Sequence, residues 1–224
     1  FAGAFFREFS PAVHEMDPFP IPRHWKRYMA IDYGLDMLAA VWAAVDEKGE
    51  VYLYRALEEP GLIVSEACAF LRRAEAEEKS PPIRYAPPDL WGREAGTGRS
   101  QMDLFEEHGF CFVRSDNDRR AGWLAVKELL APGRQGPHIH FFRGCCAPLV
   151  ASLPLLQHDQ QRPGDCMTQP HGITHSPDAL RYLCIMRKLS SRPVERWARA
   201  PRFFPEERPR TAGKKVTNVW KGLR

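Results

Sequence analysis

The sequence predicts an α/β fold built on a mixed central sheet, with three antiparallel strands first, parallel strands afterwards and helices flanking the sheet. Three extended apolar runs occupy residues 28–34, 37–46 and 50–57. Glu47-Lys48-Gly49 separates the second run from the third and has the composition of a hairpin turn. Beyond the third run, short apolar strands alternate with segments of helical periodicity, a pattern typical of parallel strands joined by helices.

Local signals predict the later elements. Apolar residues at helical spacing mark a helix over residues 63–79, and a fourth strand, 83–88, leads to Asp89. A glycine-rich loop follows at 92–99. The remaining elements are expected in the order helix 100–108, strand 110–115, helix 119–131, strand 138–142, helix 145–153, irregular loop 154–174 and a last helix ending near residue 189. Three antiparallel strands followed by helix, strand, helix and strand is the order of an RNase H-like fold, which we expect over residues 28–189.

Composition favours one substantial domain with an additional segment at each end. The hydrophobic fraction of 44% supports a core, and no apolar run approaches the length of about 18 residues that a membrane span needs. Residues 1–27 alternate aromatic residues with proline, which indicates an extended connector. The chain starts without methionine and is interpreted as a fragment of a longer protein. Its six cysteines form no CxxC pair, which favours reduced thiols, a cytoplasmic setting and no secretion.

The net charge of +4 conceals a strong asymmetry along the chain. Residues 187–224 contain twelve Lys/Arg and three acidic residues, a net charge of +9, whereas residues 1–186 carry a net charge of −5. Residues 190–224 also contain several prolines and no apolar periodicity, so an irregular basic tail is expected there. Such a tail favours a polyanionic partner, although a solvated tail that only aids solubility is the alternative.

Three aspartates are the candidate catalytic residues. Asp32 ends the first strand, Asp89 follows Pro87-Pro88 beyond the fourth strand, and Asp178 lies in the first turn of the last helix, where Ser176 is the expected N-cap. If these distant segments converge, their carboxylates repel one another unless divalent cations lie between them. Two Mg²⁺ or Mn²⁺ ions about 3.5–4 Å apart, held by oxygen ligands, are the arrangement that hydrolyses phosphodiesters.

Other residues are candidates for supporting roles. His175, three residues before Asp178, is predicted to ligate metal, position water or transfer a proton, and Asp36 is a candidate outer ligand. Helix capping accounts for Asn117 and Asp118. We expect four arginines to reach DNA phosphates, two from the glycine-rich loop and two pointing outward from the helix after Asp118: Arg93, Arg99, Arg119 and Arg120. No Gly-Lys-Ser/Thr closes the glycine-rich loop, so no ATP site is expected in this fragment.

Over residues 1–187 the sequence resembles the nuclease domain of the large terminase subunit of tailed bacteriophages. The motifs that carry the resemblance are Phe5-Phe6-Arg7-Glu8-Phe9, Pro18-Phe19-Pro20-Ile21-Pro22 before Trp25, Ile31-Asp32-Tyr33-Gly34, Pro88-Asp89-Leu90-Trp91, the run from Asn117 to Trp123, and the run from His175 to Tyr182. By this resemblance Asp32, Asp89 and Asp178 match the acidic metal-binding triad of the family, and His175 matches a histidine found in some members. Many members carry an acidic residue just before that histidine, where this chain has Thr174.

The resemblance implies a metal-dependent endonuclease that cuts concatemeric double-stranded DNA by two-metal hydrolysis during viral DNA packaging. It also implies a missing N-terminal ATPase domain, with residues 1–27 as its connector, a small terminase subunit and a portal as partners, and the cytoplasm of the bacterial host as location. Two alternatives remain from the residues themselves. One is another RNase H-like nuclease, such as a junction resolvase or a transposase core, and the other is a non-catalytic module that binds DNA or assembles with a partner.

Overall fold

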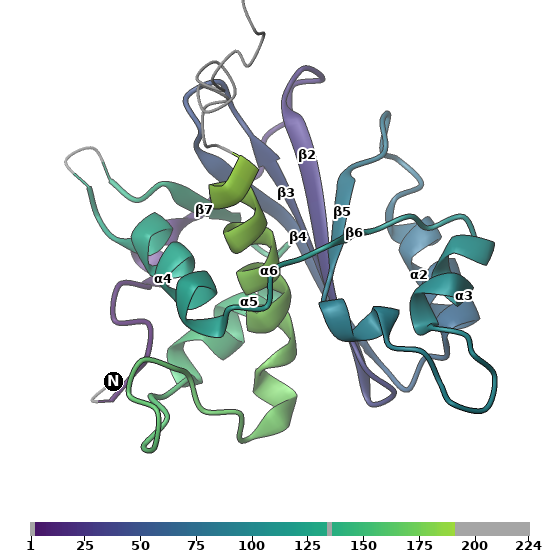
Figure 1. Cartoon of the computed structure of the whole chain (residues 1–224). Helices are drawn as coiled ribbons and strands as arrows, with labels where there is room; N and C mark the ends of the chain where they lie inside the picture. The colour runs from purple at the N-terminus through teal and green to yellow at the C-terminus, as the bar shows by residue number, and fades with distance from the viewer. Residues whose placement is uncertain (1–2, 134–135, 191–224) are drawn as a thin grey trace, which may run out of the picture. The chain divides into compact units, whose positions relative to one another are not determined.

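A mixed sheet of seven strands forms the centre of residues 3–133 and 136–190, the part of the chain that this computed structural model describes (Figure 1). The strands lie in the order β1-β7-β4-β3-β2-β5-β6. β2, β3 and β4 pair antiparallel, whereas β5 and β6 extend the sheet in parallel beyond β2, and β7 and β1 do so beyond β4. The strands are β1 (Glu15–Met16), β2 (Lys26–Tyr33), β3 (Met37–Val45), β4 (Val51–Pro60), β5 (Ile83–Ala86), β6 (Val113–Arg114) and β7 (Ile139–Phe142). The predicted fold class is confirmed.

Helices cover both faces of this sheet. α4, α5 and α6 pack on one face, and α2 and α3 pack on the other (Figure 1). The α-helices are α1 (Pro11–His14), α2 (Val64–Ala74), α3 (Gln101–Glu107), α4 (Arg119–Leu130), α5 (Ala147–Ser152) and α6 (His175–Ser190). Short 3₁₀ turns are η1 (Pro88–Trp91), η2 (Leu153–Leu155) and η3 (His171–Ile173). Among the described residues, no helix is long and apolar enough to cross a bilayer.

The alternation of side chains along β2 decides which residues face which helices. Tyr28 and Ala30 belong to the core beneath α4 and α6, while Met29 and Ile31 belong to the core beneath α2 and α3. Because side chains alternate between the two faces of a strand, Asp32 projects toward the same face as Tyr28 and Ala30. The register of a buried strand therefore directs Asp32 toward α6.

Residues 3–27 are part of the packed structure, which differs from the extended connector expected there. Phe5, Phe6 and Phe9 are buried in the same core as α4 and α6, and the edge strand β1 pairs with β7. The buried His14 imidazole bonds the Leu130 carbonyl oxygen through its Nε2 at 2.9 Å. Aromatic residues between prolines can form a core as readily as an extended linker, because the sequence pattern does not show what they pack against.

The later boundary lies close to the expected one. One compact unit runs from Phe1 to Ser191, and a second runs from Arg192 to Arg224. The predicted irregular tail, 190–224, lies outside the described residues except for Ser190, the last residue of α6. Strand β6 is shorter than the expected 110–115 because Phe110 and Phe112 are buried against α3, outside the strand pairing.

Candidate functional site

Asp32 lies near the carboxyl end of β2 and faces α6. Its Oδ2 is 2.9 Å from Nδ1 of His175, the first residue of α6. Burial is the main cause that raises the pKa of the Asp32 carboxyl; the hydrogen bond to His175 opposes this, and the negative charge of Asp178 adds to it. The same hydrogen bond raises the pKa of the His175 imidazole. A carboxylate that is buried beside another carboxylate is stabilised by a cation.

Asp89 lies at the same edge of the sheet as Asp32. β5 runs parallel to β2, with Tyr85 opposite Ala30, so both strands end at this edge. Pro87 and Pro88 stop the strand, and Asp89 then sits in η1. The Asp89 side chain is exposed and has no hydrogen bond or ion pair with any residue in the described part of the chain. Its carboxylate is therefore available to a ligand.

Asp178 lies in the first turn of α6 and is held by two arginines. Nε of Arg181 donates to Asp178 Oδ1 at 2.7 Å, and Nη1 of Arg119 donates to the same oxygen at 3.2 Å. Asp178 Oδ2 has no hydrogen-bond partner within residues 3–133 and 136–190. The arginines thus orient the carboxylate and leave one oxygen for a ligand.

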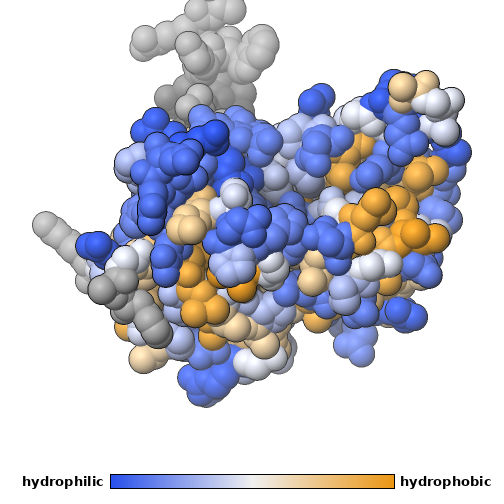
Figure 2. Space-filling view, turned by 90° about the horizontal axis from the view of Figure 1, so that it is seen from below, coloured by the Kyte–Doolittle hydropathy of each residue, from blue (hydrophilic) through white to orange (hydrophobic). Residues whose placement is uncertain are grey.

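The charges of all three aspartates act on one side chain, Tyr182. Burial is the largest cause that raises the pKa of its phenol, and the negative charges of Asp32, Asp178 and Asp89 raise it further. Figure 2 looks from below onto the edge of the sheet where β2 and β5 end, and this face is largely hydrophilic with apolar patches. The fold thus brings the surroundings of the three predicted ligands to one region of the molecule.

The three carboxylates do not form a tight ligand cluster by themselves. Within the described residues, Asp36, His171 and His175 are the group of three possible ligands whose atoms all lie within 4.8 Å of one another. Oxygens that serve two ions about 3.5–4 Å apart need not all belong to one ligand shell, so their wider spacing fits a two-ion site. The three aspartates therefore remain the predicted ligand set.

A network of buried polar groups supports Asp178, and sequence reasoning missed most of it. Asp165 accepts from Trp123 Nε1 at 2.8 Å and from Arg119 Nε at 3.1 Å. Burial opposes ionisation of Asp165, but the hydrogen bonds from Arg119 and from the Cys166 amide lower its pKa. Asp165 lies in the loop predicted to be irregular, and no sequence signal marks it.

The fully buried Arg181 links this network to α4. Its guanidinium lies over the rings of Trp123 and Tyr182, and Nη2 donates to Asn117 Oδ1 at 3.3 Å. A Cβ atom on Gly122 would be 2.5 Å from Cγ of Arg181, so only glycine permits this approach of α4 to α6. The run from Asn117 to Trp123 is therefore a support for α6.

Several sequence-based expectations about local roles need correction. Asp118 caps α4 by accepting from the Ala121 amide at 3.0 Å, as expected, but Asn117 accepts from Arg181 instead of capping the helix. Arg119 does not point outward, because Asp165 and Asp178 draw its guanidinium inward. Ser176 is not the N-cap of α6, since η3 leads into a helix that already starts at His175.

The other arginines expected to contact DNA lie at the surface. Arg120 is exposed on α4. In the glycine-rich loop, Nη1 of Arg93 donates to the Gly98 carbonyl oxygen at 2.7 Å, and Arg99 forms an exposed ion pair with Glu107. Exposed pairs of this kind contribute little to stability. These three side chains are therefore accessible to a phosphate backbone.

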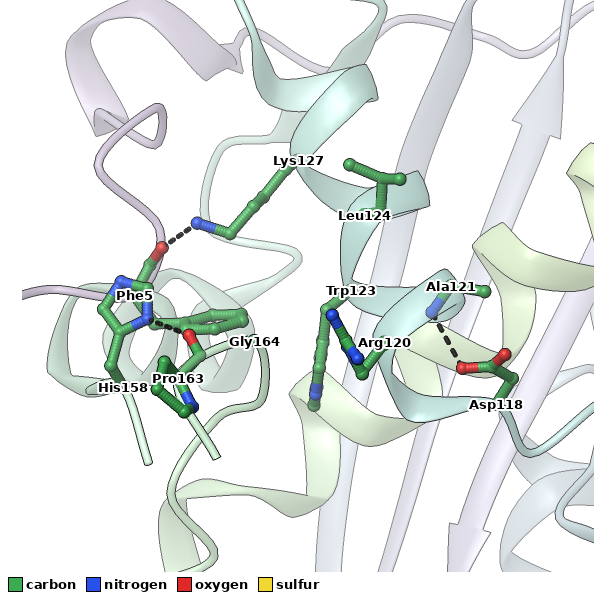
Figure 3. A pocket seen from close by; sticks show the side chains of 10 residues that line it. All are labelled: Phe5, Asp118, Arg120, Ala121, Trp123, Leu124, Lys127, His158, Pro163 and Gly164. Carbon is green, nitrogen blue, oxygen red and sulfur yellow. Dashed lines mark hydrogen bonds between the residues drawn. The ribbon is translucent and has the colours of Figure 1, made fainter. Parts of the chain in front are cut away.

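A cavity of about 500 Å³ lies beside α4 and does not include the aspartate site (Figure 3). Lys127 reaches from α4 across it to the Phe5 backbone carbonyl, and the Phe5 ring and Trp123 form its apolar part. None of the three predicted metal ligands lines it. It marks the place where residues 3–9 pack against α4.

Comparison with known proteins supports the fold. No family model and no curated protein matches the sequence. Among solved structures, the full-length large terminase of a thermophilic bacteriophage superposes with a TM-score of 0.65 at 18% identity, covering 81% of this chain and 44% of that one. The large terminase nuclease of thermophilic phage G20c, solved with bound magnesium, gives a TM-score of 0.56 at 11% identity over 83% of this chain and 97% of that one.

The nuclease domain of the Thermus phage P74-26 large terminase gives a TM-score of 0.51 at 10% identity, covering 73% of this chain and 79% of that one. The chain spans less than half the length of the first of these terminases. At these identities the similarity establishes the fold. The described residues have the RNase H-like fold of large terminase nuclease domains.

Proposed function

We propose that this chain is the DNA endonuclease domain of a viral packaging terminase and that it hydrolyses phosphodiesters with the help of divalent cations. The observation that carries the proposal is the gathering of Asp32, Asp89 and Asp178 around Tyr182 at one edge of the sheet. The shared fold with terminase nucleases, one of them solved with magnesium, supports it.

The donor set fits two hard cations. Asp32, Asp89 and Asp178 offer carboxylate oxygens, the ligands that Mg²⁺ and Mn²⁺ prefer. Asp32 is raised in pKa by burial and by the charge of Asp178, a strain that bound cations would relieve. When bound, a pair of such ions generates a hydroxide nucleophile and stabilises the leaving 3′ oxygen.

The residues of the chain hold these ligands in place. His175 keeps Asp32 oriented through its Nδ1, and Asp32 itself stands on a buried strand. Arg181 and Arg119 fix Asp178 Oδ1 and leave Oδ2 for the cation. Ligands anchored on rigid elements preserve the geometry that catalysis requires.

The proposed substrate is concatemeric double-stranded DNA in the cytoplasm of an infected bacterium. Exposed Arg93, Arg99 and Arg120 would contact its backbone phosphates without reading bases. Arg119 is left out of this set because it already neutralises Asp165 and Asp178. In a full-length parent, an ATPase domain would precede the nuclease, and a small terminase subunit and a portal would be its partners.

Plasmid cleavage with Mg²⁺ or Mn²⁺ tests the proposal. We expect Asp32→Asn to abolish cleavage while the protein stays folded, because the substitution removes a charged oxygen ligand and keeps the shape. Asp17→Asn is the matched control, since Asp17 is exposed and pairs only at the surface with Arg143. Undiminished cleavage by Asp32→Asn, or no cleavage by the unaltered chain with either ion, would contradict the proposal.

A further inference from the structure

Three side chains beside the aspartate site form a compact cluster that the proposed nuclease reaction does not use as a unit. Nδ1 of His171 lies 3.0 Å from Asp36 Oδ2, and Nε2 of His175 lies 3.3 Å from the same oxygen. The two imidazole rings meet edge to face with centroids 4.4 Å apart. Asp36 follows β2, His171 opens η3 and His175 opens α6, so three separate elements deliver these atoms.

The spacing of these atoms matches the ligand shell of a small transition ion. Ligands about 2.1 Å from a tetrahedral ion lie about 3.4 Å from one another. The two printed separations of 3.0 and 3.3 Å are close to that value, and all three ligand atoms lie within 4.8 Å. Small rotations of the exposed Asp36 and His171 side chains would suffice to centre an ion.

Asp32 provides the support that a ligating histidine requires. A histidine that binds metal through one ring nitrogen usually donates its other N–H to a carboxylate, which fixes the tautomer and the ring orientation. Here Nδ1 of His175 faces Asp32 Oδ2 at 2.9 Å, so Nε2 is left as the acceptor that points toward Asp36 and His171. The His175 side chain is only 4% exposed, which holds this orientation.

We propose that Asp36, His171 and His175 form a binding site for a borderline divalent transition ion of the Zn²⁺ class, separate from the carboxylate site assigned to Mg²⁺ or Mn²⁺. Two imidazoles and one carboxylate suit Zn²⁺, Co²⁺ or Ni²⁺, whereas Mg²⁺ prefers oxygen ligands. Three protein ligands leave a fourth position for water. The site goes beyond the proposed nuclease function and does not require it.

Calorimetric titration of the metal-free chain with Zn²⁺, in excess Mg²⁺, tests this site. The unaltered chain should bind one Zn²⁺, and His171→Ala should weaken binding by at least about tenfold, as losses of metal-site groups commonly do. Asp36→Asn should do the same and guards against a misfolded alanine variant, since both residues are exposed. His138→Ala is the matched histidine control, because His138 is exposed and pairs with Glu50.

Two further arms separate this site from the other possible ones. Asp89→Asn should keep the Zn²⁺ affinity, because Asp89 belongs to the candidate nuclease ligands and not to this cluster. Absorption of the Co²⁺ complex should lack a thiolate-to-metal band, which excludes Cys111, the exposed cysteine of the described residues. The proposal is overturned if Zn²⁺ does not bind, if His171→Ala and Asp36→Asn bind it as before, if Asp89→Asn abolishes binding, or if a thiolate band appears.

Discussion

Replacing Arg181 with methionine should destabilise the chain strongly, because this arginine is a buried charge whose partners would lose their counterion. Arg181 is fully buried, donates to Asp178 at 2.7 Å and to Asn117 at 3.3 Å, and packs over two aromatic rings. Methionine fills much of the same volume but cannot pair with Asp178. The carboxylate would then keep only Arg119 as a charged partner.

The expected loss can be worked out from this burial. Removing one partner of a buried ion pair costs roughly 3–5 kcal/mol. Asp178 retains Arg119 and is slightly exposed, so the lower end, about 3 kcal/mol, is expected. For a protein of this size each kcal/mol corresponds to about 2–4 °C in Tm, which gives a fall of roughly 6–12 °C.

Urea and thermal unfolding of the metal-free proteins provide the assay. Arg143→Met is the control, because the Arg143–Asp17 pair is exposed and its loss should cost less than about 1 kcal/mol. Combining Arg181→Met with Asp178→Asn should cost less than the sum of the single changes, since the second removes the orphaned charge. A loss below about 1 kcal/mol for Arg181→Met, or simple additivity in the double variant, would refute the assigned network.

Three other outcomes follow from the same structure. Gly122→Ala should lower the unfolding free energy by up to about 2 kcal/mol, since the clash with Arg181 outweighs the better helix propensity; a gain in stability would contradict the close approach. Asp32→Asn should become more stable relative to the unaltered chain as pH rises, in thermal melts without metal. The raised pKa values of Asp32 and His175 make their contributions present at low pH and lost upward from the ordinary values of 3.8 and 6.5, so a pH-independent difference would count against this. Phe5→Ala should cost about 3–5 kcal/mol in urea unfolding if residues 3–9 belong to the core, whereas a loose connector would show almost no change.

The order and pairing of the main strands could be predicted because local patterns determine them. The β3 segment is apolar on both faces, which is typical of a central strand, and Glu47-Lys48-Gly49 joins it to β4 by a tight turn. Since β2 is amphipathic only at its ends, the alternation around Ala30 also predicts the face that Asp32 occupies.

The supporting contacts could not be predicted, because they join residues far apart in the sequence. Asp165 meets Arg119 across 46 positions, and a helical pattern alone places Arg119 on an exposed face. Likewise, the role of Gly122 depends on where Arg181 of another helix lies. The pairing of His171 with Asp36 depends on how the loop before α6 folds back onto the β2–β3 turn.

The most direct test of the central claim is anomalous diffraction from crystals of the chain soaked in Mn²⁺. We expect density within ligand distance of Asp32, with Asp89 and Asp178 completing the coordination. Mn²⁺ bound only elsewhere, or a structure in which one of these carboxylates cannot reach the ions that the other two hold, would contradict the assignment of this edge of the sheet as a cation-dependent nuclease site.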